Sequence, residues 1–306
     1  MNLDEVEKQV LKTVAGIDGI PEGAYNFRIN GKSLSRKSSE NIDVQTRTDG
    51  KGLEIHIDGK TKNEAVHIPV IISKSGLTED VYNDFYVEDG AEVAIVAGCG
   101  IYNCGTFTSV HNGIHTFHVG KNCKVKYIEK HYGTGFGAGK ILNPVTKVFV
   151  DDSSFVELEL EQIKGVDSTE RVTTVELGNN AEALIREKTF SEGRQTVDSK
   201  ISVTAKGENS KVDIVSRAVA RDISKQKFSS EIIGDAKCRG HSECDAILMD
   251  KAQVLAVPSL DARNLDAELI HEAAIGKIAG EQIDKLMTLG LSEEQAVAQI
   301  INGFLA

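Results

Sequence analysis

Alternating hydrophobic and polar positions dominate the chain from residue 53 onwards. Residues 53–58 (LEIHID) alternate in this way, and residues 156–161 (VELELE) give the clearest example. A period of two is typical of a strand that buries one face. His56 falls on the polar face, so we expect it to be solvated. Between Tyr86 and Val257 no stretch shows a convincing helical period.

From residue 87 the strands form a repeat. Each copy is a short strand, a turn rich in Gly, Asp and Asn, and a second alternating strand. The turns recur roughly every 30 residues, a spacing typical of a β-solenoid, whose coils stack parallel strands over a continuous apolar core. A β-sandwich would place turn signals every 8–12 residues or so. The turn residues are Gly90, Gly120, Asp152, Asn179, Gly207 and Asp235.

Helical periods appear at both ends of the chain. Residues 2–15 predict a short amphipathic helix, and residues 16–50 are a weakly patterned lead-in rich in Gly, Ser and Asn. After Glu272 the period returns to 3.6, in a stripe that ends at Gly290. We therefore divide the chain into an N-terminal helix and lead-in (1–50), a β-helix core (51–268) and a C-terminal helical segment (269–306).

The last predicted helix begins at Ser292, which forms a capping box with Gln295. Its apolar residues share one face near the end of the sequence, which makes that face a candidate for binding a partner. They are Val297, Ile300, Ile301 and Phe304.

Composition excludes several classes of protein. The chain has 35 basic and 46 acidic residues, a formal charge of −11, and no basic stripe, so it is not expected to bind nucleic acid. It shows no signal peptide, no apolar run long enough to span a membrane and no Walker A motif. We expect a cytoplasmic protein that does not itself hydrolyse ATP.

The five cysteines match no standard disulfide or zinc pattern. An odd number without a signal peptide argues against a disulfide framework, and no C-x-x-C is present. His111, His115 and His118 do not form a convincing metal site, because His115 and His118 have odd spacing and point to opposite faces of a strand.

A long, ordered series of residues near the C-terminus carries a family resemblance. Cys244-Asp245 and Leu248 are followed by a strand with Pro258, then by His271-Glu272-Ala273, and finally by Asn302-Gly303-Phe304. This series closely resembles the SufB proteins of the SUF iron–sulfur cluster assembly system. The resemblance covers roughly residues 65–306 and suggests a minimal SufB-like protein. It implies a right-handed parallel β-helix, in agreement with the repeat.

The resemblance also implies a cluster site. Cys244, His271 and Glu272 would supply sulfur, nitrogen and oxygen ligands to a transient iron–sulfur cluster shared between two subunits, in a homodimer or with a SufD-like second subunit. The residues alone leave another interpretation open, in which Cys244 is a buried core residue and the His-Glu pair only caps a helix.

A second implied site concerns sulfur. Gly98-Cys99 matches a Gly-Cys that accepts sulfur in the family, and its position between glycines suggests an accessible loop thiol. Lys147 matches a lysine along an internal sulfur path, and His131 lies near that path. The alternative is a core cysteine with a solvated lysine and histidine.

The implied partners are a sulfur donor protein and the SufC-like ABC-type ATPase, which docks on the C-terminal helical segment in this family. The chain would then be a scaffold and not an enzyme. One alternative is a SufD-like adaptor, although the SufD type lacks the cysteine at position 244. Another is a β-helix polysaccharide lyase or hydrolase that uses outward carboxylates such as Glu157 and Glu159.

Overall fold

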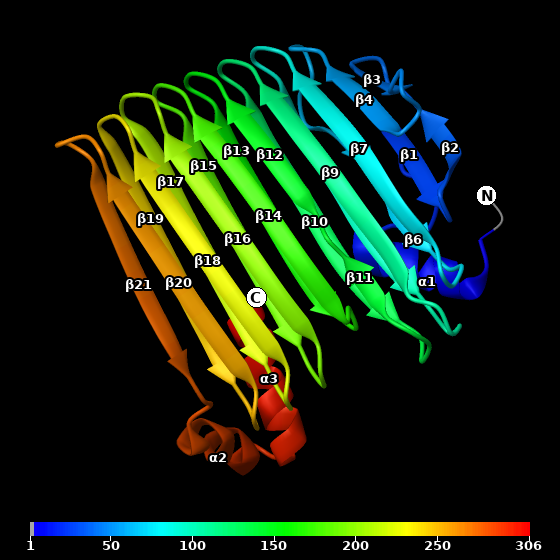
Figure 1. Cartoon of the computed structure of the whole chain (residues 1–306), viewed down its shortest axis with the longest axis vertical. Helices are drawn as coiled ribbons and strands as arrows, with labels where there is room; N and C mark the ends of the chain where they lie inside the picture. The colour runs from blue at the N-terminus through cyan, green and yellow to red at the C-terminus, as the bar shows by residue number, and fades with distance from the viewer. Residues whose placement is uncertain (1–2) are drawn as a thin grey trace.

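Two stacks of strands wind around a common interior to form a β-solenoid (Figure 1). The computed structural model describes residues 3–306. The first sheet, here sheet A, contains β1 (Ala24–Ile29), β2 (Lys32–Lys37), β5 (Glu64–His67), β6 (Val70–Ile72), β8 (Glu92–Tyr102), β10 (Lys124–Thr134), β13 (Phe155–Lys164), β15 (Glu182–Ser191), β17 (Ser210–Ala220), β19 (Cys238–Leu248) and β21 (Glu268–Gly276).

The second sheet, sheet B, faces sheet A across the interior. In both sheets the strands pair in parallel with strands of the coils before and after. Among residues 3–306, the antiparallel pairs are the hairpin β1–β2 in sheet A and the hairpin β3–β4 in sheet B. Sheet B contains β3 (Ile42–Thr46), β4 (Gly52–Ile57), β7 (Thr78–Val87), β9 (Ser109–Val119), β11 (Lys140–Leu142), β12 (Val145–Val150), β14 (Ser168–Leu177), β16 (Thr196–Ala205), β18 (Lys225–Gly234) and β20 (Gln253–Ala262).

The apolar positions of the alternating pattern face the inside of the solenoid, and the polar positions face the outside. Along β13, for example, Val156, Leu158 and Leu160 are buried while the glutamates between them are partly exposed. Such inward side chains form one continuous apolar cluster from Ala24 to Cys244. The predicted β-solenoid is confirmed.

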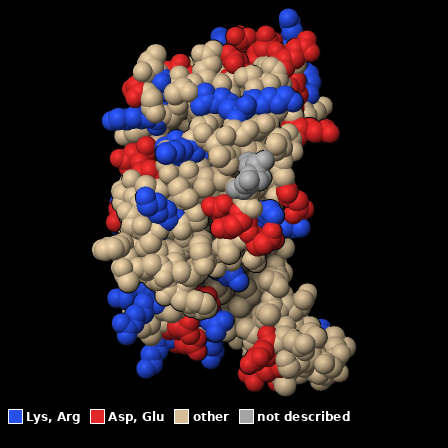
Figure 2. Space-filling model, turned by 90° about the vertical axis from the view of Figure 1, so that its right-hand side faces the viewer, with Lys and Arg blue, Asp and Glu red and all other residues tan. Residues whose placement is uncertain are grey.

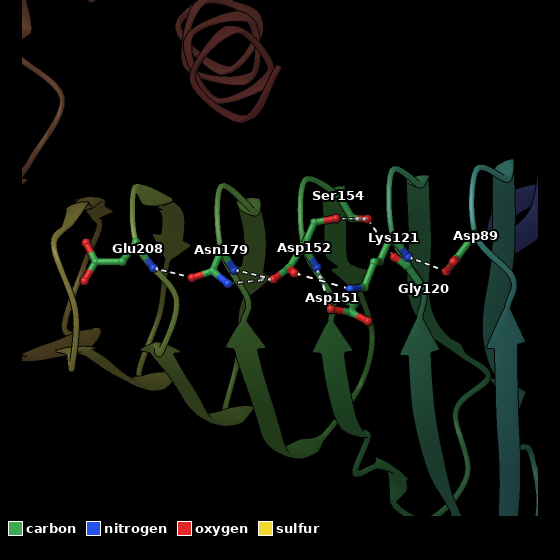
Figure 3. Close-up of polar contacts among 8 residues, drawn as sticks. All are labelled: Asp89, Gly120, Lys121, Asp151, Asp152, Ser154, Asn179 and Glu208. Carbon is green, nitrogen blue, oxygen red and sulfur yellow. Dashed lines mark hydrogen bonds and ion pairs between the residues drawn. The ribbon is translucent and has the colours of Figure 1, made fainter.

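A ladder of side-chain hydrogen bonds joins the repeated turns (Figure 3). Asp89 Oδ1 accepts from the backbone N–H of Lys121 (2.7 Å), and Asp152 Oδ1 accepts from that of Asn179 (2.8 Å). The Asn179 side chain in turn accepts from the backbone N–H of Glu208 (2.9 Å). Each acidic or amide side chain therefore satisfies a backbone donor of the next coil, which explains why the same turn chemistry recurs.

The N-terminal region is more ordered than its composition predicts. Helix α1 (Glu5–Ala15) is confirmed and is capped by Asp4, while Asn2, where the predicted helix begins, lies outside the described residues. Within residues 16–50, however, β1, β2 and β3 close the first coil, so most of the lead-in belongs to the solenoid. The two hairpins bury apolar residues such as Phe27 and Ile42. The weak alternation of apolar and polar residues in this region did not predict these strands.

The C-terminal helices begin later than the sequence suggested. Strand β21 runs to Gly276, so the His-Glu pair lies in a strand and not at a helix entry. Helices α2 (Gly280–Thr288) and α3 (Glu293–Leu305) follow, and the predicted capping box of Ser292 and Gln295 is present. The last coil, β20 and β21, leaves one edge of each sheet unpaired within residues 3–306. None of the helices described is long and apolar enough to cross a membrane.

Candidate functional site

A cluster of charged side chains lies inside the otherwise apolar solenoid. Arg171, on β14 of sheet B, reaches across to sheet A and forms an ion pair with Glu129 of β10. Its Nε lies 3.5 Å from Glu187 Oε1, and its Nη2 lies 3.3 Å from His131 Nδ1. His131 Nε2 is 3.3 Å from Glu129 Oε1. All four side chains are at most 4% exposed, so this is a desolvated charge network.

The pKa values in this cluster are set by the competition between burial and charge. Burial alone would raise the pKa of Glu129, but Arg171 and His131 outweigh it and lower that pKa. Burial raises the pKa of Glu187, and Arg171 with two serine hydroxyls offsets this only in part. Burial also lowers the pKa of His131. Glu129 is thus held as the anion, whereas Glu187 is the carboxyl that most readily takes a proton.

Cys99 lies at one end of this cluster. It is the neighbour of His131 across the β8–β10 pair, and both side chains face the interior. The expectation of an accessible loop thiol is wrong: Cys99 is inside a strand and 3% exposed. The flanking Gly98 and Gly100 lie under helix α1, where a Cβ on Gly98 would come within 2.2 Å of the Val14 carbonyl oxygen. Burial raises the pKa of the Cys99 thiol well above its usual value, and only Arg171 counteracts this.

Cys244 lies at the other end. Glu187, Ser216 and Cys244 are successive partners across β15, β17 and β19, all facing inward. Ser216 Oγ donates to Glu187 over 3.4 Å, and Ser199 Oγ from sheet B donates to the same carboxylate over 2.5 Å. Burial raises the pKa of Cys244 to about 11. A chain of polar side chains therefore runs inside the solenoid from one cysteine to the other, through His131, Arg171, Glu187 and Ser216.

Several polar atoms along this interior have no hydrogen-bond partner within residues 3–306. Buried atoms of this kind are normally satisfied by water or by a ligand. They include Tyr127 Oη, Glu129 Oε1, Gln162 Nε2, Thr173 Oγ1 and His271 Nδ1. The interior between the two cysteines therefore offers polar atoms that a water molecule or a small ligand could satisfy.

The two residues of the predicted His-Glu pair point in opposite directions. His271 pairs with Ser242, faces inward and lies diagonally beside Cys244 across β19 and β21. Glu272 faces outward, with its side chain 70% exposed, and its Oε2 lies 3.8 Å from His241 Nε2. Within one chain, Cys244 and His271 can therefore share a site, whereas Glu272 is on the other face of the sheet. The reason is that both residues lie in a strand, where neighbours alternate sides.

Lys147 does not belong to the interior. It is an exposed, outward residue of β12, next to the inward Thr146. The predicted path lysine is therefore placed incorrectly, and the cation between the cysteines is Arg171. The signal for it was present in the sequence: Glu129, Arg171 and Glu187 occupy the inward parity of alternating strands, where a charged residue is costly and unusual.

The predicted partner-binding face of α3 is largely occupied by the chain itself. Ile301 is 9% exposed, and the guanidinium of Arg217 on β17 lies 6.0 Å from the ring centroid of Phe304. Val297 and Ile300 are half-buried. The residues that cover this face come from sheet A, which precedes α3 in the sequence. The position of α3 near the end of the sequence therefore did not indicate that its apolar face was covered. Helix α2 is more exposed and has no buried residue.

The outward carboxylates Glu157 and Glu159 are both engaged in ion pairs. Glu157 is bound by Arg186 and Lys126, and Glu159 by Lys126, on the outer face of sheet A. Within the part of the chain that the structure describes, no group of three or more His, Cys, Asp or Glu side chains is placed to hold a metal ion.

Comparison with known proteins identifies the family to which the chain belongs. Residues 81–304 match the family model described as SUF system FeS cluster assembly, SufBD core domain. The chain belongs to the SufBD family. Membership implies a role in iron–sulfur cluster assembly, and the matched segment contains both cysteines and the whole charge network.

Individual relatives support this assignment. An iron–sulfur cluster assembly SufBD family protein of Archaeoglobus fulgidus is 31% identical over 245 residues, which are 78% of this chain and 65% of that protein. A relative of Methanocaldococcus jannaschii is 26% identical and covers 100% of this chain and 99% of its own length. A third, of Methanothermobacter thermautotrophicus, is 26% identical, and the match spans 58% of that protein. The chain thus spans less than two thirds of the first and third relatives.

We predict that Glu129→Gln strongly destabilises the fold, because it removes the carboxylate that pairs most closely with the buried Arg171 and leaves only Glu187, at 3.5 Å, to compensate this charge. The expected loss is about 3–5 kcal/mol in the free energy of unfolding, measured by urea denaturation. Glu159→Gln, which breaks an ion pair on the outer face of the neighbouring strand, is the matched control and should cost less than about 1 kcal/mol. Equal losses in the two variants would show that the internal network has no special role in stability.

Proposed function

We propose that the chain is a scaffold of the SufB type, which accepts sulfur at Cys99, passes it through the interior and assembles an iron–sulfur cluster at Cys244. The observation that carries the proposal is the continuous polar route between these two cysteines. Family membership supplies the chemical context. The chain would act as an assembly component in the cytoplasm and not as an enzyme.

Sulfur transfer to Cys99 needs a thiolate. In the proposed step, the Cys99 thiolate attacks the outer sulfur of a donor persulfide, an S–S bond forms, and the donor cysteine leaves as a thiolate that takes up a proton. Arg171 is the cation that favours the Cys99 anion, and His131 beside it can accept the thiol proton. Release of the outer sulfur from Cys99 as sulfide would need two electrons from an external thiol reductant, which breaks the S–S bond and regenerates the Cys99 thiol. At the other end, Glu187 can hold a proton close to Ser216 and Cys244.

The cluster site would lie at the C-terminal end of the solenoid and be completed by a second subunit. Cys244 and His271 face the interior there, beneath the unpaired edges of β20 and β21. A homodimer through this coil would place both residues twice around a two-fold axis, and Glu272 of each chain could reach the interface from the outer face. Thiolate, imidazole and carboxylate would then surround one small cluster, with a SufD-like subunit as an alternative partner.

The surface of the last coil favours self-association. It carries six exposed large apolar side chains, a concentration suited to an interface. Pro258, on the edge strand β20, lacks an N–H and so limits uncontrolled pairing of that edge. The six residues are Leu255, Val257, Leu260, Leu265, Ile270 and Ile275.

We further propose that α2, more than α3, receives the SufC-like ATPase. Met287 is 43% and Leu289 is 76% exposed, beside the half-buried Ile283 and Leu286. Together they form an apolar surface on the helix that is least covered by the rest of the chain.

The first test concerns cluster holding. Cys244→Ala and Glu272→Ala should each abolish the cluster after anaerobic reconstitution with iron and sulfide, while the dimer persists. Cys238→Ala is the control, because Cys238 is a buried cysteine of the same strand that also faces inward. Iron content, absorption spectra and sedimentation would be measured for all three. Full iron in Cys244→Ala would contradict the SufB-type assignment and favour a SufD-like adaptor.

A second test separates sulfur acceptance from cluster holding. Cys99→Ser should block assembly when a persulfide-carrying protein supplies sulfur but should tolerate free sulfide, which can reach the cluster site without the relay. Cluster formation would be followed by absorption with each sulfur source. Equal loss with both sources would make Cys99 a ligand or a packing residue and refute the route.

The partner proposal can be tested on α2 alone. Met287→Glu combined with Leu289→Glu should abolish co-purification of the ATPase, because two charges would replace the exposed apolar side chains. Gln299→Glu, at an exposed position of α3, is the control for added charge. Undiminished ATPase binding by the double variant would exclude this face.

A further inference from the structure

A cavity of about 290 Å³ opens at the N-terminal end of the solenoid, far along the chain from the proposed cluster site. It lies between the hairpins β1–β2 and β3–β4, and its floor includes Val70, Val81 and Asn83 of the next coil. Figure 2 faces this end of the molecule and shows a band of Lys and Arg side chains across its upper half. We call this cavity the N-terminal mouth; its polar lining residues are Asn26, Arg28, Lys32, Ser33, Arg36, Thr46 and Asn83.

The charge of the mouth is unusual for this chain. Three cations line it and no carboxylate does, although the chain carries a formal charge of −11. Four further grooves of the molecule each include at least one carboxylate in their lining. The lining therefore carries an excess of positive charge that can attract an anion, even though Glu79 pairs with Arg28 beside it.

Two of the three cations have no acidic partner. Arg36 donates from Nε to Asn26 Oδ1 (3.1 Å) and from Nη1 to Thr46 Oγ1 (2.7 Å), both neutral acceptors. Among residues 3–306, neither Arg36 nor Lys32 has a carboxylate within ion-pair distance. Arg28 pairs with Glu79 through Nε only (2.9 Å), and Glu79 is shared with His111. The Nη groups of Arg28 are thus available to a ligand.

The floor adds a buried polar group without a complete set of partners. Asn83 is 3% exposed, its Nδ2 lies 3.3 Å from His115 Nδ1, and its Oδ1 has no partner within the described residues. Burial lowers the pKa of His115 to about 4, so the ring is neutral and carries one proton. If that proton is on Nδ1, the Asn83 amide reverses, its oxygen accepts from His115, and its NH₂ group becomes free to donate into the mouth.

We propose that the N-terminal mouth binds a small oxyanion with two negative charges, of the size and shape of inorganic phosphate or sulfate. Guanidinium groups match tetrahedral oxyanions through paired N–H donors, and Arg28 and Arg36 supply such donors from adjacent strands. Lys32 adds a charge at the rim, and Asn83 adds a neutral donor at the floor when its amide takes the reversed orientation. Because Arg36 already links β2 to β3, an anion held there joins the two hairpins that close the solenoid. This site is independent of the proposed cluster function.

Isothermal titration calorimetry of the full chain with inorganic phosphate tests the proposal, with sodium chloride keeping ionic strength constant. We expect one site per chain, similar binding of sulfate, and much weaker binding of acetate. Arg36→Gln should weaken phosphate binding roughly tenfold or more, since it removes a charge-assisted donor, and Lys32→Gln by about threefold. Phosphate should also raise the melting temperature of the wild-type chain, because it binds the folded state.

Lys200→Gln is the matched control, since Lys200 is an exposed outward residue of β16 at a distance from the mouth. Its phosphate affinity should equal that of the wild type. If Arg36→Gln fails to fold, Lys32→Gln still tests the proposal. Its substitution should not disturb folding, because the exposed Lys32 side chain forms no ion pair within residues 3–306. The proposal is refuted if the wild type shows no saturable phosphate binding, if acetate binds as tightly as phosphate, or if Lys200→Gln loses as much affinity as Lys32→Gln.

Discussion

Every functional feature of this chain depends on the alignment of one coil upon the next. Parallel pairing makes residues about 30 positions apart into direct neighbours, so that His131 lies beside Cys99 and Ser216 beside Cys244. The hydrogen-bond ladder at the turns holds this alignment (Figure 3). A slip of one residue would turn the inward charges to solvent and expose the apolar core.

Inside the aligned coils, the buried ion network is the exception to an otherwise apolar interior. Placing Arg171, Glu129 and Glu187 in the interior costs desolvation free energy, which their mutual contacts offset only while all partners remain. An apolar interior would be simpler to fold. The charge between the two cysteines is therefore costly for stability, which is consistent with the role proposed for it in sulfur transfer.

The sequence was sufficient for the fold because its signals are local and repeated. The alternation around Leu158 and the turns near Asp152 and Asn179 predicted the solenoid, and the structure confirms it. The site was only partly predictable. The resemblance suggested both His131 and Lys147 for the internal path. His131 does face the interior, whereas Lys147 lies outside because its strand neighbour Thr146 takes the inward position. The burial of Cys99 results from its inward position in β8, which was hidden by the glycines on either side, and the cover over Ile301 results from α3 packing on sheet A. No period in the sequence encodes the second contact.

The two glycines beside Cys99 have a mechanical consequence. Because Gly98 and Gly100 have no side chains, the backbone of α1 rests directly on the outer surface of β8, with Val10 and Val14 filling the space. Helix α1 therefore covers the outer face of β8 at this point, opposite the inward side chain of Cys99. Any larger side chain at position 98 or 100 would push α1 away from the strand without touching the thiol or the interior.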